Sequence, residues 1–140
     1  MDGRIKAAIE TAVGREPFAR SAGIKLVALE EGYSRVEMVY DPARHDNIYG
    51  RAHGGAVFGL IDEAFETAGQ TDGTVAVAMN VNVTYIASPE PGARLCAEAR
   101  RIAQTKRTAT YDIKVSDGEN RLIAVCHALA YRTGKPIPLL

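Results

Sequence analysis

The sequence predicts an α+β fold in which one long helix is covered by a curved antiparallel sheet. Residues 53–69 carry apolar side chains at helical spacing. Runs of alternating apolar and polar residues, which are typical of strands, lie on both sides of them. The order is helix, two strands, long helix, four strands, and it lacks the strict alternation that a parallel sheet requires. Because consecutive strands joined by short turns pair antiparallel, the long helix is the element large enough to cover one face.

The N-terminal part is expected to contain a helix and a hairpin. Apolar residues at helical spacing predict a helix over residues 3–13, which a glycine follows. Strands are predicted over residues 23–29 and 33–40, with a turn at residues 30–32 between them. Residues 41–52 break both patterns and predict an ordered loop.

The part after the long helix is expected to consist of strands. Four are predicted, over residues 75–86, 94–103, 108–116 and 121–132. The segment Ser-Asp-Gly-Glu-Asn at residues 116–120 is a strong hairpin turn between the last two. Pro136 and Pro138 predict a tail after the final strand.

The composition indicates one globular domain covering residues 1–140 and excludes several classes of protein. Lys plus Arg equals Asp plus Glu at 17 each, which gives no indication of a nucleic-acid partner. No apolar run approaches the roughly 20 residues of a membrane span, and the charged N-terminus is no secretory signal. Cys96 and Cys126 fit neither a disulfide framework nor a metal spacing, so we expect a reduced, cytoplasmic protein. Three scattered histidines argue against a zinc site, and we expect no metal.

The long helix carries acids beside its apolar stripe. On a helical wheel, the apolar side chains fill one broad arc, formed by Ala56, Val57, Phe58, Leu60, Ile61, Ala64, Phe65 and Ala68. Asp62, Glu63 and Glu66 occupy the remaining arc. Asp62 lies at the apolar edge, where partial desolvation favours a raised pKa and a stronger base. Acids on the outer face of a helix are usually solvated, so a surface role for Asp62 stays open.

The helix start, His53-Gly54-Gly55, has two interpretations. The first N–H groups of a helix have no partner within the helix and carry partial positive charge. A substrate carbonyl oxygen placed there would be polarised as in an oxyanion hole, because glycines allow close approach to the backbone. The alternative is a helix start whose glycines only permit tight packing.

Residues 45–68 resemble a known family. The resemblance rests on the pattern His45-x-Asn47-x-x-Gly50-x-x-His53-Gly54-Gly55-x-x-x-x-Leu60-x-Asp62-x-Ala64. This pattern is similar to the signature of the phenylacetate-pathway, or PaaI-type, branch of hotdog-fold thioesterases. The segment from Asn82 to Pro89 is similar to the strand that follows the helix in that family.

The resemblance implies a hotdog fold and hydrolysis of an acyl-CoA substrate, with an aryl or medium-chain acyl group, to the carboxylic acid and free CoA. It implies no cofactor. Asp62 would act as nucleophile or as the general base that activates water, and Gly54 would offer its backbone N–H to the thioester oxygen. Asn47 would position water or the thioester from the partner's loop, and His53 would orient the loop or bond near the carbonyl.

The spacing of these residues argues for a homodimer. Asp62 lies nine residues after His53, which is roughly 13 Å along one helix. Within one chain, Asp62 and the Gly54 N–H are therefore too far apart to contact the same thioester group. Two antiparallel helices from different protomers would remove this difficulty. The resemblance implies such a dimer and, beyond it, a homotetramer.

Substrate-binding residues are also expected. They are Gly55, Phe58, Phe65, Tyr85, Arg101, Lys106 and Arg107. The aromatic side chains would line an acyl pocket, and the basic ones cluster with Arg100 around a predicted hairpin turn, where they could meet the CoA phosphates. A solvated turn is the alternative for the basic cluster.

One position departs from the family pattern. Several relatives carry a hydroxyl residue on the strand after the helix, where this chain has Ala78. Thr67, Asn80 or Thr84 could supply the missing polar group.

Two other functions remain open from the sequence. A non-catalytic module that binds acyl-CoA needs no base, so the presence of both Asn47 and Asp62 argues against it. A hotdog hydratase or dehydratase pairs a catalytic histidine with an acid on a different motif, which we do not find here.

Overall fold

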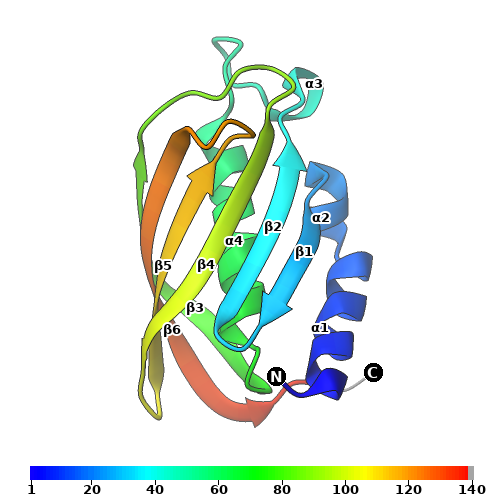
Figure 1. Cartoon of the computed structure of the whole chain (residues 1–140), viewed down its shortest axis with the longest axis vertical. Coiled ribbons are helices and arrows are strands. Elements are labelled where there is room, and N and C mark those ends of the chain that lie inside the picture. Colours follow the sequence, from blue (N-terminus) through cyan, green and yellow to red (C-terminus); the bar gives the residue numbers. More distant parts are fainter. Residues whose placement is uncertain (139–140) are drawn as a thin grey trace.

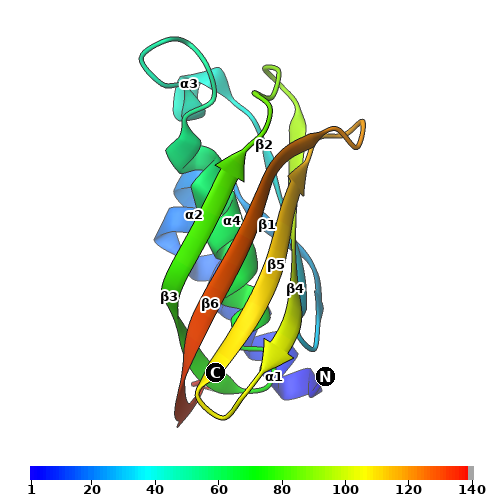
Figure 2. The same cartoon turned by 90° about the vertical axis from the view of Figure 1, so that its left-hand side faces the viewer.

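The computed structural model describes residues 1–138 and confirms the α+β class. Six strands form one antiparallel sheet in the order β1-β2-β4-β5-β6-β3, which curves around α4 (Figures 1 and 2). The elements are α1 (Gly3–Arg15), α2 (Pro17–Ala22), β1 (Lys25–Glu30), β2 (Tyr33–Val39), α3 (Pro42–His45), α4 (Gly54–Gly69), β3 (Thr74–Tyr85), β4 (Arg94–Gln104), β5 (Thr108–Ser116) and β6 (Leu122–Pro136). Within residues 1–138, no helix combines the length and apolarity needed to cross a membrane.

Two helices, rather than one, precede the sheet. The carboxylate of Asp2 caps α1 by accepting from two backbone N–H groups, and this helix runs beyond its predicted end to Arg15. The sequence-based prediction lacked α2, which starts with Pro17, a residue whose fixed φ and missing N–H suit a first helical position. It ends at Ala22, and Gly23, whose φ of 78° is left-handed, caps it, so the first strand starts later than predicted, at Lys25.

The loop and the C-terminus also differ from expectation. Residues 41–52 are ordered, as predicted, but they include the short helix α3. The predicted tail is wrong, because β6 continues to Pro136, which lies opposite Thr74 of β3. Ile137 is buried, and its N–H donates to the Gly73 carbonyl at 2.9 Å. Pairing with the start of β3 therefore holds this segment despite its prolines.

The core lies between α4 and the concave face of the sheet. The predicted apolar stripe is buried at Val57, Leu60, Ile61, Ala64, Phe65 and Ala68, while Phe58 is half-buried. Full burial of a Leu, Ile or Phe side chain contributes about 1.5–3 kcal/mol, so this stripe anchors α4 against the sheet.

Glu63 departs from the wheel-based expectation. The wheel places it with Asp62 and Glu66 on the polar arc, yet Glu63 is 2% exposed whereas the other two are exposed. The wheel treats the outer arc as facing water. In the folded chain, Glu16, at the junction of α1 and α2, lies beside Glu63 and covers this part of α4.

Candidate active site

The first turn of α4 leaves one backbone amide unbonded. His53 caps the helix, and its Nδ1 accepts from the Gly55 N–H at 2.8 Å. The His53 carbonyl accepts from the N–H groups of Ala56 and Val57 at 2.9 and 3.3 Å. Among residues 1–138, no acceptor engages the Gly54 N–H. Because the helix N-terminus carries partial positive charge, this amide is the one donor of the turn that is available to an oxyanion.

Tyr85 of β3 packs over the same turn. Its hydroxyl donates to the Gly54 carbonyl at 3.0 Å. A Cβ at Gly54 would lie 3.3 Å from Cζ of Tyr85, and one at Gly55 would lie 3.0 Å from Nδ1 of His53. Both glycines therefore let a side chain approach the helix start closely. At Gly55 that side chain is the cap itself.

Asn47 shapes the loop that precedes α4. Its Oδ1 accepts from the N–H groups of Tyr49 and Arg51 at 2.9 and 3.1 Å, an arrangement in which an Asn side chain stabilises a turn. The carbonyl oxygen of the side chain is thus committed to the loop. The Nδ2 amino group is the part of Asn47 that can serve a ligand as donor.

His45 ties this loop to the rest of the chain, which the sequence did not indicate. Its Nδ1 accepts from the Asp41 N–H at 2.9 Å, so a neutral ring donates through Nε2 to the Ala22 carbonyl at 2.8 Å. The His45 carbonyl accepts from the His53 N–H at 2.6 Å. His45 is buried, and its bonds connect α2, the loop and the start of α4. The sequence feature that could have indicated this role is the position of His45 as the first residue of the motif.

Asp62 lines a cavity between α4 and the edge of the sheet. The cavity measures about 260 Å³ and is lined by Asp62, Phe65, Glu66, Gly69, Ala76, Val77, Ala78 and Ala130. Although the side chain of Asp62 is exposed, desolvation by the residues around it raises its pKa. Phe65 is buried and meets Tyr111 edge to face, with ring centroids 5.3 Å apart. The methyl group of Ala78 faces the same cavity as Asp62, so this strand position supplies no hydroxyl there.

The predicted site residues fall into two groups within one chain. Asn47, His53, Gly54 and Tyr85 gather at the start of α4, whereas Asp62 lies further along the helix. The eight residues from Gly54 to Asp62 correspond to about 12 Å of helical rise. A single chain therefore presents Asp62, the predicted base, and Gly54, the predicted oxyanion donor, at separate places.

The family profile of the thioesterase superfamily matches residues 49–124, more than half of the chain. The chain belongs to the thioesterase superfamily. It is 30% identical to the acyl-coenzyme A thioesterase PaaI of Escherichia coli over 119 residues, which are 85% of this chain and 84% of that protein. The structure of E. coli PaaI superimposes with a TM-score of 0.91 over 96% of this chain and 97% of that one, at 26% identity. These similarities confirm a PaaI-type hotdog thioesterase, which is a thioester hydrolase.

Two further solved structures resemble this thioesterase. A mutant of the phenylacetic acid degradation protein PaaI from Thermus thermophilus matches with a TM-score of 0.79 and 34% identity, covering 84% of this chain and 99% of that one. A Streptococcus mutans protein that was solved bound to acetyl-CoA matches with a TM-score of 0.77 and 25% identity, covering 81% and 91%.

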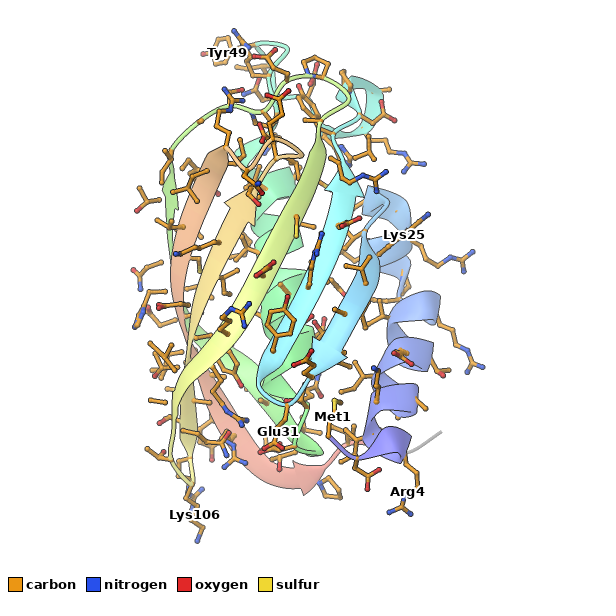
Figure 3. All side chains as sticks on the ribbon, in the orientation of Figure 1. Met1, Arg4, Lys25, Glu31, Tyr49 and Lys106 are labelled. Atoms are coloured by element: carbon orange, nitrogen blue, oxygen red, sulfur yellow. The ribbon has the colours of Figure 1, made fainter. Side chains whose placement is uncertain are left out.

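The basic residues predicted to meet the CoA phosphates lie apart from the start of α4. Arg101 is largely buried and pairs with Glu31 at 3.3 Å. Lys106 and Arg107 are exposed in the turn between β4 and β5, and Arg107 donates to the Tyr131 hydroxyl at 3.1 Å. Figure 3 shows Lys106 at the opposite end of the molecule from Tyr49 and its loop. Within one chain, this turn cannot serve a ligand held at Gly54.

Proposed function

We propose that this thioesterase hydrolyses acyl-CoA to a carboxylic acid and free CoA, in a site shared by two protomers. Asp62 of one protomer supplies the base or nucleophile, and the Gly54 N–H of its partner stabilises the oxyanion. The observation that carries the proposal is the unbonded Gly54 amide in a helix turn whose other donors are all engaged. The acyl-CoA substrate is supported by the named relative from E. coli and by the neighbour that was solved with acetyl-CoA.

The chemistry needs only groups of this chain and water. Water adds to the thioester carbon while Asp62 takes its proton, and the carbonyl oxygen becomes the oxyanion that Gly54 holds. Collapse breaks the C–S bond, and the CoA thiolate takes up a proton to leave as the free thiol. Alternatively, Asp62 attacks the carbon itself and the C–S bond breaks to release the CoA thiolate, and water then hydrolyses the resulting mixed anhydride. Both routes are compatible with a partly desolvated carboxylate, and neither requires a cofactor.

A homodimer formed through β3 would assemble the site. β3 is an edge strand of 12 residues with a neighbour on one side only, and its apolar residues Val77 and Met79 are 51% and 58% exposed. Long, exposed, apolar edges are normally protected from pairing in monomers. A second copy paired antiparallel along this edge would reverse the direction of α4 and bring Asp62 of one protomer toward Gly54 of the other. A homotetramer of two such dimers is the larger assembly that we propose.

The same two-fold arrangement would bring basic side chains close to the CoA moiety. It brings the end of one protomer that carries Lys106 and Arg107 toward the partner's end that carries Asn47. Exposed cations there would meet the CoA phosphates. Arg101, by contrast, is engaged with Glu31. Phe58, Phe65 and Tyr85 would line the acyl pocket.

Fewer residues can replace the hydroxyl that is missing at Ala78 than the sequence suggested. The Thr67 hydroxyl is buried and bonded to Ser34 at 2.6 Å and to the Glu63 carbonyl at 2.7 Å. It is therefore committed to the core and cannot hold an attacking water. Asn80 and Thr84 lie exposed on β3, and we propose that one of them, or the Nδ2 group of Asn47, positions the water.

Thiol release from a panel of aryl- and alkyl-CoA esters tests the proposal. Asp62→Asn keeps the shape of the side chain and removes the base, so we expect a rate at least about 100-fold lower than that of the parent. Glu66→Gln removes the other carboxylate of the same cavity and is expected to lower the rate less than about tenfold.

The possible results separate the competing functions. Equal losses in the two variants would contradict the assignment of Asp62. A parent that binds acyl-CoA without releasing thiol would indicate a binding module. Loss of enoyl-CoA absorbance without thiol release would indicate a hydratase.

A further inference from the structure

Three carboxylates converge on the side of α4 that faces the N-terminal helices. Glu16 comes from the junction of α1 and α2, and Glu63 and Glu66 come from α4. One carboxylate oxygen from each lies within 4.8 Å of the other two. None of these acids takes part in the proposed hydrolysis.

Glu63 shows that this cluster lacks a positive partner. Its side chain is 2% exposed, and among residues 1–138 its Oε1 is enclosed without a hydrogen-bond partner. No Lys, Arg or His nitrogen of residues 1–138 lies within 4.0 Å of the three carboxylates. Burial and the neighbouring Glu16 raise the pKa of Glu63 to about 8, and burial also raises the pKa of Glu66. A buried carboxylate without a partner is strongly unfavourable, so Glu63 must either take up a proton or face a cation.

The geometry suits a metal cation better than a proton. A proton on Glu63 would bridge at most one pair of oxygens, and the charges of Glu16 and of the exposed Glu66 would still face each other within 4.8 Å. A cation with oxygen ligands at about 2.3–2.6 Å places opposite ligands up to about 5 Å apart, which matches the spread of this cluster. A cavity of about 340 Å³, lined by Glu16 and Glu66 together with Ala12, Val13, Arg15 and Gln70, opens beside the cluster, and among the described residues the Arg15 guanidinium makes no ion pair with its acids. It provides an entry path and room for water ligands.

We propose that Glu16, Glu63 and Glu66 bind a divalent cation of the oxygen-preferring class, such as Ca²⁺, Mn²⁺ or Mg²⁺. The cation joins the N-terminal helices to α4 and satisfies the buried Glu63. Its role is structural, because it lies outside the set of groups that the hydrolysis uses. The site is distinct from a structural zinc site, since its three ligands are all carboxylates and none is Cys or His.

Binding of Mn²⁺ alone to the chelator-treated full chain tests this site. Near neutral pH, electron paramagnetic resonance should show one Mn²⁺ bound per chain, and Ca²⁺ should displace it. Thermal unfolding should show a Tm raised by several degrees at saturating Mn²⁺. Glu63→Gln and Glu16→Gln should each weaken binding by at least about tenfold. Glu10→Gln, an exposed acid on α1, makes the same charge change outside the cluster and should leave binding unchanged.

Several results would overturn the proposal. These are no binding at Mn²⁺ concentrations up to about 1 mM, or equal binding by the parent and both cluster variants. A shared proton instead of a cation would give a Tm of the parent that is insensitive to Mn²⁺ and falls as pH rises toward 9, with no such fall in Glu63→Gln. Glu16→Gln keeps the buried residue intact and reports on the site even if Glu63→Gln unfolds. Because no substrate is present, these results are independent of the proposed hydrolysis.

Discussion

At the residue scale, Gly54 and Gly55 carry adjacent amides with different partners. The Gly55 N–H donates to the cap, while the Gly54 N–H is free to bind a ligand.

Proline at position 54 would remove this N–H and still be compatible with the helix. Gly54 is the first helical residue, and His53 before it has an extended backbone, with φ −64° and ψ 132°. Alanine adds a Cβ at the same place, 3.3 Å from Tyr85, and keeps the N–H. We expect the kcat of Gly54→Pro to be about 10²- to 10³-fold lower than that of Gly54→Ala. Equal rates in thiol-release assays would exclude this amide as the oxyanion donor.

Asp72 and Arg132 form a largely buried ion pair between the start of β3 and β6. Burial opposes ionisation of Asp72, but the Thr74 N–H at 3.0 Å and the Arg132 guanidinium outweigh it and hold the pKa of Asp72 below its ordinary value. Since the folded pKa is lower than the unfolded one, the stabilisation is complete above the unfolded pKa. It is lost as pH falls through the folded pKa.

Asp72→Asn should therefore destabilise the chain in a pH-dependent way. At neutral pH we expect the free energy of unfolding to fall by about 1–3 kcal/mol, and the difference from the parent should shrink below about pH 4. Denaturant titrations at several pH values measure both quantities. Glu10→Gln serves as the exposed control, and a difference that stays constant with pH would contradict the linkage.

At the scale of elements, the two edges of the sheet differ. β1 is covered by α1, whereas β3 presents an exposed edge to solvent (Figures 1 and 2). A lysine on an edge strand opposes pairing with another chain. If β3 forms the proposed dimer interface, Met79→Lys should convert the dimer to a monomer and lower thiol release together with it. Ile102→Lys places the same charge at an equally exposed apolar residue of β4 and should keep both dimer and activity. Light scattering during size-exclusion chromatography measures the mass, and a dimeric, active Met79→Lys would exclude β3 as the interface.

At the scale of the whole molecule, the shared site predicts complementation. In the proposed shared site, Asp62→Asn and Gly54→Pro would inactivate different halves, so a mixed dimer would contain one intact site and one with both defects. Random exchange of subunits should restore about one quarter of the parental activity, because about half of the dimers are mixed and each has one working site. Thiol release measured after co-refolding tests this. No recovery, with mixed dimers shown to be present, would place both groups in one chain's site.

Local spacing was sufficient to predict most elements. The apolar stripe of α4 and the alternating strands depend on neighbours within a few positions, so their periodicity is visible in the chain. The motif from His45 to Ala64 indicated the family, and the profile match confirmed it. The missed elements, α2 and α3, are short and carry little periodicity, and β6 extends through prolines because β3 lies beside it.

Only the tertiary structure determined which side chains and backbone amides are available to a ligand. Glu63 is buried beside Glu16, a residue far away in the sequence, and the Thr67 hydroxyl is unavailable to a ligand because it bonds to Ser34. Gly54 retains a free N–H because His53 folds back onto Gly55, and Tyr85 from β3 covers the turn. Periodicity reports which way a residue faces on its own element. Burial, partners and pKa depend on what other elements bring to that face, and only the packed chain determines this.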